Sequence, residues 1–498
     1  MDTWVYLLVA IVTLFWFYVK RSHGFWARQN VPGKPPTFLF GHLDILGRKH
    51  LAQGIKETYD SFKKTSDYAG FYFFTSPRII PLSLDLIKHI LVKDFNYFSD
   101  RKLYFNEKDD PLSAHLFSIR GEKWRTYRQQ LSPTFTSGKI KMMYPLIVEH
   151  IGALKAFLRK NMKQGPMDFK DVCTRYAADV IGLTAFGMEC NALKNEKSEI
   201  LRMNHLLFTF DTFAKRLNLL FTASFEEISR KMHLRIVPKE LEDWFMGMIK
   251  ETLRLRESGK VDRNDFVKLL RQLKNKGTGA SEDLTFNETA AQAFIFFFGG
   301  FETTATTMHY CCGYLAKKQD IQERVREEVR QVLKKYNGEL TYEAAHELTY
   351  LKQCIDETLR MHPPGFSLFR MAINDYRVPN SSLVIKKGQE VIIPIYGIHM
   401  DPDIYPNPDV FDPDRFSAEN VKKRHPMAHL PFGEGPRNCI GMRFALLELA
   451  VAISSIVDNF KLTMNPKTIF PFQFDTKDLA ILPKGGIWID IEELKAGQ

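Results

Sequence analysis

The sequence predicts a mainly α-helical protein with a minor β-sheet, built as a single large domain behind an N-terminal membrane anchor helix. Three observations predict this: an apolar segment over residues 4–19, two clear helix starts in the second half of the chain, and short apolar segments towards the C-terminus that suit strands. The 498 residues are 26% charged and 45% hydrophobic, as in globular proteins. That composition excludes a disordered chain, a collagen-like repeat and a many-span membrane protein.

The N-terminal segment has the features of an uncleaved anchor. Residues 4–19 are apolar apart from Thr13 and form a helix of about 24 Å. Aromatic residues lie near both of its ends, and basic residues follow on one side only, which places that side in the cytosol: Trp4, Tyr6, Trp16, Tyr18, Lys20, Arg21 and Arg28. A cleaved signal peptide and a buried helix are the alternatives, but Asp2 stands where a signal peptide has basic residues. We predict an anchor over residues 1–20, a basic, proline-rich hinge over 21–36 and one body over 37–498.

The body contains a long apolar helix. Thr285 and Glu288 have capping-box spacing, and the helical sequence then extends from 286 to 318, about 50 Å. Between 290 and 301 every residue except Gln292 and the two glycines is apolar, so we expect this helix to cross the middle of the protein. A second helix is predicted from Asp320 to about residue 337, and strands are predicted over 390–396 and 480–491.

The loop from Phe432 to Gly441 is the most informative segment. Glycines 433 and 435 permit a tight turn, and Cys439 precedes an apolar helix that begins at Met442. The helix dipole and free amides there are expected to lower the pKa of this thiol. None of the six cysteines forms a CxxC pair, and His346-Glu347 lacks the second histidine of HExxH, so neither a zinc site nor a disulfide framework is indicated.

This loop resembles the haem-binding loop of the cytochrome P450 monooxygenases. The match holds at six fixed positions: Phe432, Gly433, Gly435, Arg437, Cys439 and Gly441. The resemblance implies that haem b is the cofactor and that Cys439 is the axial thiolate ligand of its iron. It also implies that Phe432 shields the sulfur and that Arg437 pairs with a haem propionate.

Inside the long helix, the string Gly299-Gly300-Phe301-Glu302-Thr303 contains two glycines that each cost about 1 kcal/mol relative to alanine. The Thr303 hydroxyl is placed to bond the carbonyl of residue 299 and bend the helix. Taken alone, the string also suits a simple kink with a solvent-facing glutamate. By resemblance to the family, Thr303 and Glu302 form the acid and alcohol pair that organises protons for oxygen activation.

Three further sets of residues gain roles by resemblance. Glu357 and Arg360 share a helix face, which alone would more often mean an exposed ion pair. The family implies instead a buried network, joined by Arg415, that serves folding and haem retention. It also implies that four residues are partners of the haem propionates: Trp124, Arg128, Arg101 and Arg370. The forked guanidinium of the three arginines suits a carboxylate partner.

The aromatic segments that would line a substrate pocket predict an apolar substrate. They are residues 105–117, residues 206–221, Phe294, Phe298 and residues 366–369. Each of these aromatics is individually as suited to the core as to a pocket.

The chain carries no GxGxxG or GxxxxGK[ST] motif, so we expect its electrons to come from a separate NADPH-dependent reductase, with cytochrome b5 as a second candidate partner. The net charge of +11 suits such a partner or an acidic membrane surface. Candidate docking residues, which are equally suited to an ordinary solvated surface, are Lys123, Arg125, Lys422, Lys423 and Arg424.

The resemblance covers the whole chain in the expected order and is greatest to the animal microsomal group that includes insect xenobiotic-metabolising enzymes. It implies insertion of one atom of O2 into a lipophilic small molecule, an endoplasmic reticulum membrane location with the catalytic body on the cytosolic face, and no nucleic-acid partner. Two alternatives remain: a haem isomerase or dehydratase of the same fold, which the intact Glu302-Thr303 pair disfavours, and a non-catalytic haem protein that binds a gas or lipid.

Overall fold

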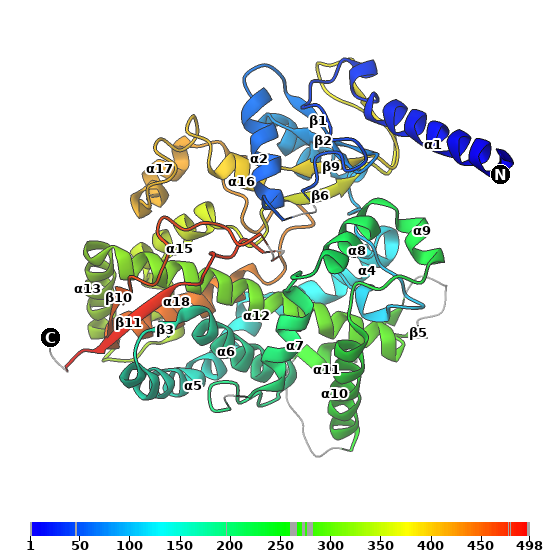
Figure 1. The fold of residues 1–498 in the computed structure, drawn as a ribbon. Helices are drawn as coiled ribbons and strands as arrows, with labels where there is room; N and C mark the ends of the chain where they lie inside the picture. The colour runs from blue at the N-terminus through cyan, green and yellow to red at the C-terminus, as the bar shows by residue number, and fades with distance from the viewer. Residues whose placement is uncertain are drawn as a thin grey trace.

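The protein is described by a computed structural model over residues 2–44, 47–195, 197–258, 266–270, 274–275, 282–476, 478 and 480–495. The fold is mainly helical with small sheets, as the sequence predicts (Figure 1). The α-helices are α1 (Asp2–His23), α2 (Leu51–Phe62), α3 (Leu84–Lys88), α4 (Gly121–Leu131), α5 (Ser137–Asn161), α6 (Phe169–Ile181), α7 (Glu199–Phe208), α8 (Phe213–Ser224), α9 (Glu226–Lys231), α10 (Lys239–Glu257), α11 (Phe266–Leu270), α12 (Phe286–Lys317), α13 (Gln319–Lys335), α14 (Tyr342–Glu347), α15 (Thr349–Met361), α16 (Ile395–His399), α17 (Ala418–Lys423) and α18 (Met442–Asn459).

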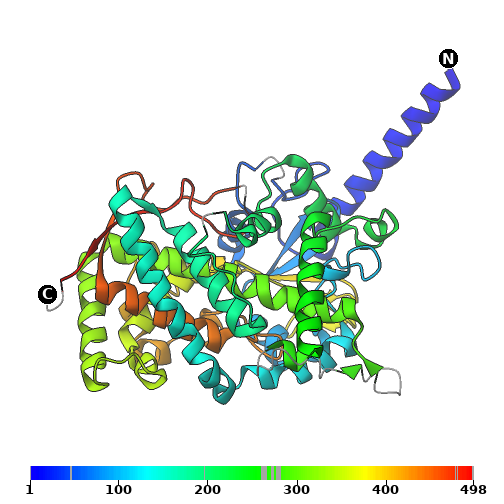
Figure 2. The same ribbon diagram turned by 90° about the horizontal axis from the view of Figure 1, so that it is seen from below.

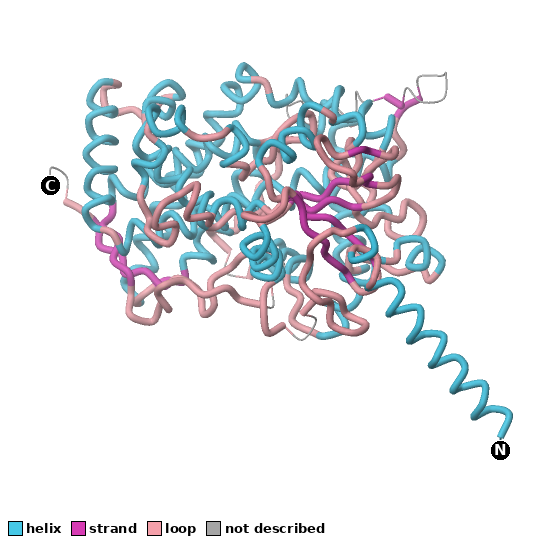
Figure 3. Tube along the Cα trace, turned by 90° about the horizontal axis from the view of Figure 1, so that it is seen from above, coloured by secondary structure: helices cyan, strands magenta, loops and turns pink. Residues whose placement is uncertain are grey.

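The strands lie in small sheets at the edges of the helical body (Figure 3). The largest sheet has the order β1-β2-β9-β6, in which β2 and β9 are parallel and the other pairs antiparallel; a second has the order β10-β11-β3. The strands are β1 (Tyr68–Phe73), β2 (Ser76–Pro81), β3 (Met167–Asp168), β4 (Lys274–Asn275), β5 (Glu282–Asp283), β6 (Leu368–Met371), β7 (Tyr376–Arg377), β8 (Val384–Ile385), β9 (Glu390–Ile393), β10 (Phe460–Met464) and β11 (Trp488–Glu493).

Helix α12 is the long central helix that the sequence predicts. The Thr285 hydroxyl accepts a bond from the Glu288 amide, and the Glu288 carboxylate accepts one from the Thr285 amide, so the capping box is confirmed. The helix ends at Lys317, one residue earlier than predicted, and most of its residues are buried. It packs against α6, α15 and α18, which places its middle turns in the interior of the protein (Figure 1).

Two predicted strands are shorter in the structure. The segment predicted as a strand over 390–396 leaves the sheet after Ile393, because Pro394 has no amide hydrogen to donate, and α16 follows. The segment predicted over 480–491 becomes a strand only at Trp488, because Gly485 and Gly486 adopt positive φ angles of 78° and 76° and turn the chain.

Helix α1 projects away from the body (Figure 2) and is exposed over most of its length. Residues 3–29 contain the one helix among the described residues that is long and apolar enough to cross a membrane, and only 6% of its apolar window is buried. The alternative of a buried core helix is therefore wrong. Its end is fixed to the body, because the buried Trp26 packs on Gly70 of β1 and donates its indole N–H to the Phe71 carbonyl at 3.3 Å.

The core has two parts. A helical core surrounds α12, α6 and α18, and a second core lies around the β1-β2-β9-β6 sheet. Leu430 packs in the sheet core, whereas Phe432, two residues later, packs against the helical core. The cysteine loop therefore lies at the boundary between the two parts of the molecule.

Candidate functional site

The cysteine loop is a tight, glycine-dependent turn. The Cys439 amide donates to the Phe432 carbonyl at 2.8 Å, which closes the loop. Gly433 and Gly435 adopt positive φ angles of 70° and 75°, and a Cβ atom at Gly435 would overlap the carbonyl oxygen of Leu91. The loop therefore needs glycine at 435 both for its backbone conformation and for its close approach to the neighbouring chain.

Cys439 is accessible although protein surrounds it. Its side chain has accessible surface, and burial by the surrounding chain is nevertheless the main influence on its pKa. Burial raises the pKa of the thiol, while the amides of Gly441 and Met442 lower it, as does the positive charge of Arg128. The amides at the helix start lower this pKa as expected, but burial outweighs them, so the net direction is upwards. A bound metal cation would deprotonate a coordinating thiol outright.

A cluster of buried arginines lies beside Cys439. Arg370 on β6 is 0% exposed, and among the described residues its Nε and Nη2 atoms have no partner. The same holds for Nε and Nη1 of Arg437 in the cysteine loop. Burial lowers the pKa of Arg370 to about 10, and burial together with the positive charge of Arg370 lowers that of Arg437 to about 9. The nearest carboxylate is that of Asp100, 3.7 Å from Arg437. Buried positive charge with unmatched N–H donors fits a bound dianion such as the two propionates of haem.

The other predicted propionate partners use their donors within the protein. Arg101 donates to the carbonyls of Phe117 and Arg437 at 3.1 and 3.0 Å. Arg128 donates to the backbone and side-chain oxygens of Asn438 at 2.9 and 2.8 Å. Arg101 therefore fastens the loop before α4 to the cysteine loop, and Arg128 fastens α4 itself to that loop.

Trp124 lies beneath this cluster. The Arg437 guanidinium stacks over its ring, 4.1 Å from the ring centroid. Trp124 therefore orients Arg437.

The structure brings Glu357, Arg360 and Arg415 together. The Glu357 and Arg360 side chains are fully buried and form a bidentate pair with distances of 2.7 and 2.8 Å. The Arg415 Nε atom lies 3.4 Å from the Glu357 carboxylate. Arg360 also donates to the carbonyls of His399 and Pro408, so the pair joins α15 to the chain that leads to the cysteine loop. The alternative of an exposed ion pair is excluded by this burial.

Thr303 and Glu302 face different surroundings on α12. The Thr303 hydroxyl donates to the Gly299 carbonyl at 2.8 Å, as predicted, and its side chain is accessible in the middle of a buried helix. Helix α12 packs on α18, the helix that follows Cys439 in the sequence. Glu302, in contrast, is 4% exposed and accepts bonds from Lys170 on α6 and Asn204 on α7 at 2.5 and 2.7 Å.

The aromatic candidates for the pocket divide into core and accessible residues. Phe294 and Phe298 are 4% and 1% exposed, and their rings pack against the ring of Phe245. They therefore belong to the helical core. Phe117 is 47% exposed beside the arginine cluster, where the Arg101 guanidinium lies 4.1 Å from its ring. Phe117 is therefore better placed than either core residue to contact a substrate.

Most of the candidate docking residues are engaged within the chain. Lys123 pairs with Glu107 and Glu288, Arg125 with Glu122, and Lys423 with Glu419. Arg424 stacks on Tyr405 and Phe416. Lys422 is exposed and has no ionic partner among the described residues.

Sequence reasoning missed Asp100, Lys170 and Asn204. Lys170 and Asn204 stand 132 and 98 positions from Glu302 and belong to no motif, so no spacing rule connects them. The Phe98-Ser99-Asp100-Arg101 string was the available signal for Asp100, because an acid beside a candidate arginine is a natural partner. Among the described residues no group of His, Cys, Asp and Glu has the arrangement of a separate metal site.

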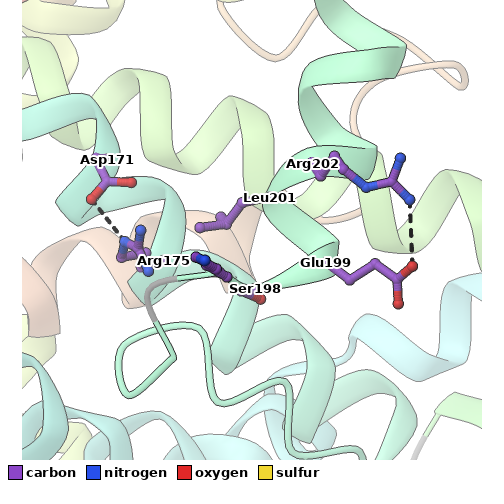
Figure 4. A pocket seen from close by; sticks show the side chains of 7 residues that line it. Asp171, Arg175, Ser198, Glu199, Leu201 and Arg202 are labelled. Carbon is purple, nitrogen blue, oxygen red and sulfur yellow. Dashed lines mark hydrogen bonds and ion pairs between the residues drawn. The ribbon is translucent and has the colours of Figure 1, made fainter.

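A surface depression of about 500 Å³ lies apart from this site, between α6 and the start of α7 (Figure 4). Its lining is mostly charged, with Asp171 paired to Arg175 and Glu199 to Arg202. None of the residues that surround Cys439 contributes to it. The depression is therefore not the site of the predicted chemistry.

Comparison with known proteins identifies the family. A family model described as Cytochrome P450 matches residues 31–489. Cytochrome P450 6A1 of Musca domestica is 40% identical over 500 aligned positions, covering 99% of this chain and 98% of that protein. Cytochrome P450 6a2 and probable cytochrome P450 6a14 of Drosophila melanogaster are 38% and 39% identical over 98% and 95% of this chain, and over 99% and 96% of their own lengths. The cysteine loop and the arginine cluster of this chain agree with these full-length similarities, and the chain belongs to the cytochrome P450 family of monooxygenases.

Proposed function

We propose that this protein inserts one atom of O2 into lipophilic small molecules while the other atom leaves as water. The observation that carries the proposal is the accessible Cys439 thiol beside buried arginines whose N–H groups lack partners. Those residues suit a haem held by its iron and its propionates. Haem bound through a cysteine thiolate supplies reductive activation of O2, and the chain itself supplies binding, orientation and protons.

The residues of the site divide the work by their contacts. Cys439 is the ligand of the iron, and Phe432 packs beside the loop that presents it. Arg370 and Arg437 would hold the propionates, because they have buried donors for which no acceptor competes among the described residues. Arg101, Arg128 and Trp124 position the loop and Arg437.

Thr303 and Glu302 manage protons. The Thr303 hydroxyl is an accessible polar group on the middle turns of α12, where it would hold and relay a proton once haem is bound. Glu302 is the nearest acid in sequence and is held on the side of α6 and α7. The Glu357, Arg360 and Arg415 network keeps the chain around the cysteine loop folded and so retains the haem.

The substrate class follows from the apolar surroundings. The accessible Phe117 ring and the half-buried turn of α12 around Gly299 present apolar surface, so an apolar xenobiotic, insecticide, hormone or lipid is favoured over an ionic substrate. Electrons come from NADPH through a membrane-bound reductase, with cytochrome b5 as a further donor, and α1 anchors the protein in the endoplasmic reticulum membrane with the body in the cytosol. Lys422 is the one candidate docking residue whose charge is free among the described residues.

The experiment is product formation under isotopically labelled O2. Full-length protein, reductase and NADPH are incubated with a panel of steroids, fatty acids, plant toxins and insecticides, and products are analysed by mass spectrometry. We expect one labelled oxygen atom per oxidised product, with formation abolished when NADPH or the reductase is omitted. Product without label and without need for NADPH would favour the isomerase or dehydratase alternative. Substrate binding without turnover across the panel would favour the non-catalytic binder.

A further inference from the structure

Glu302 lies at the centre of a polar cluster contributed by three helices. The Lys170 ammonium on α6 donates to Glu302 at 2.5 Å and to the Thr306 hydroxyl at 3.0 Å. The Asn204 amide on α7 donates to the other carboxylate oxygen at 2.7 Å. Both carboxylate oxygens are therefore held, one by a charge and one by a neutral donor.

The cluster is buried at Glu302 and reaches solvent at Lys170. The Glu302 side chain is 6% exposed and the Lys170 side chain 21%. The depression between α6 and α7 lies next to this junction, because it is lined by Asp171, adjacent to Lys170, and by Leu201, one turn before Asn204 (Figure 4). The polar path thus leads from the α6 and α7 surface to the middle of α12.

Some buried polar atoms near Glu302 have no hydrogen-bond partner among the described residues. The Asn204 Oδ1 atom and both ring nitrogens of His309 are buried and have no partner in the described part of the chain. His309 follows Thr306 by one turn on α12 and interacts electrostatically with Lys170. Buried polar groups of this kind are normally satisfied by ordered water, which also carries protons.

The other titratable groups that interact with Lys170 leave the pair as the main charges. Burial raises the pKa of the Cys173 thiol and lowers that of the His309 imidazole, so both groups are neutral near pH 7. Asp168, next to α6, is a third group whose pKa burial raises. Lys170 is therefore the cation that compensates the buried Glu302 carboxylate.

We propose that Lys170 and Asn204 are positioning residues for Glu302, which pair with its carboxylate and hold it turned towards α6 and α7, on the solvent side of the proton supply to Thr303. The inference rests on the proposed role of Glu302. Its consequence is that the proton supply depends on residues of α6 and α7 that lie outside the cysteine loop and its arginine cluster. Asn204 further ties the position of α7 to that supply.

The test compares K170M and K170R with K163M, since Lys163 is exposed and has no ionic partner among the described residues. A buried carboxylate without its cation takes up a proton. The infrared difference spectrum between K170M and K170M/E302Q is therefore expected to show the carbonyl band of a protonated carboxyl. K170M is expected to melt a few degrees lower than K163M, and K170M/E302Q to recover most of that loss. K170R is expected to restore the ionised carboxylate and the melting temperature.

Turnover supplies the functional readout. K170M is expected to lower product formed per NADPH several-fold with substrate affinity unchanged, K170R to restore it, and N204A to lower it less. The thiolate band of the reduced carbon monoxide complex checks that each variant keeps its site. An unchanged melting temperature and no protonated carboxyl in K170M would overturn the inference. Full coupling in E302Q would instead overturn the proposed role of Glu302, so the two failures are distinguishable.

Discussion

At the residue scale, two neighbouring threonines on α12 make the same bond to the helix backbone but differ in exposure. Thr303 donates to the Gly299 carbonyl and Thr304 to the Gly300 carbonyl, both at 2.8 Å. Thr303 is exposed within the body, whereas Thr304 is 3% exposed. The two side chains make the same local bond, and only one is accessible to a reacting group.

We therefore expect T303A to divert electrons from product to peroxide or water. Proton delivery by a positioned group is typically worth a factor of about 100 or more, so product per NADPH is expected to fall at least tenfold. T304A removes the matched backbone bond and is expected to keep the wild-type ratio. Peroxide and product are measured against NADPH consumed, and equal coupling in the two variants would remove Thr303 from the proton path.

The buried arginines carry a second residue-scale prediction. Replacing Arg437 with methionine removes buried donors and one of the positive charges beside Arg370. Charged hydrogen bonds contribute about 1.5–3 kcal/mol each, so R437M is expected to lose haem roughly tenfold or more faster. The rate of haem transfer to an excess of apomyoglobin measures this loss. R125M changes an exposed arginine paired with Glu122 and is expected to retain haem normally, and matching rates would contradict the assignment.

At the element scale, the cysteine loop depends on glycine where it meets the preceding chain. G435A would force a side chain into the Leu91 carbonyl at a positive φ of 75°. Gly138, at the start of α5, has open space at its Cβ position and no such φ angle. We expect G435A to lose most of its bound haem and G138A to keep it, as measured by haem absorbance per protein. Full haem content in G435A would show that the loop relaxes elsewhere.

The elements also show what could be predicted from the sequence. The start and path of α12 follow from the Thr285 capping box and the apolar residues after it, because these signals are local. The strand ends were overestimated, because Pro394 and the turn at Gly485 and Gly486 interrupt apolar segments that otherwise suit strands. The partners of Glu302 were not predictable, because Lys170 and Asn204 come from distant helices that only the packing brings together.

The pKa of Cys439 shows the same limit for the site. Its place before α18 is local and was predictable, but the burial that raises its pKa arises from the surrounding fold. The family motifs predicted which arginines to examine. They did not distinguish Arg370 and Arg437, which keep unpaired donors, from Arg101 and Arg128, whose donors reach backbone carbonyls.

At the scale of the whole molecule, the anchor and the body are joined at Trp26. Helix α1 is exposed over most of its length, while Trp26 is 2% exposed on β1. We expect a variant lacking residues 2–19 to keep its folded body and to move from the membrane fraction to the carbonate-soluble fraction. Substituting three leucines of α1 with alanine is a milder control that retains the helix. Complete retention of the truncated protein in membranes would show that the body itself supplies the attachment.

The two parts of the core meet at the cysteine loop. The central claim about the whole protein is that Cys439 in this loop is the ligand of haem iron. The most direct measurement is the absorption spectrum of the reduced protein with carbon monoxide. We predict the red-shifted Soret band of a thiolate complex in the wild type and in C190A, which changes a cysteine remote from the loop in sequence. C439H is predicted to abolish that band. A normal thiolate band in C439H would contradict the assignment of Cys439.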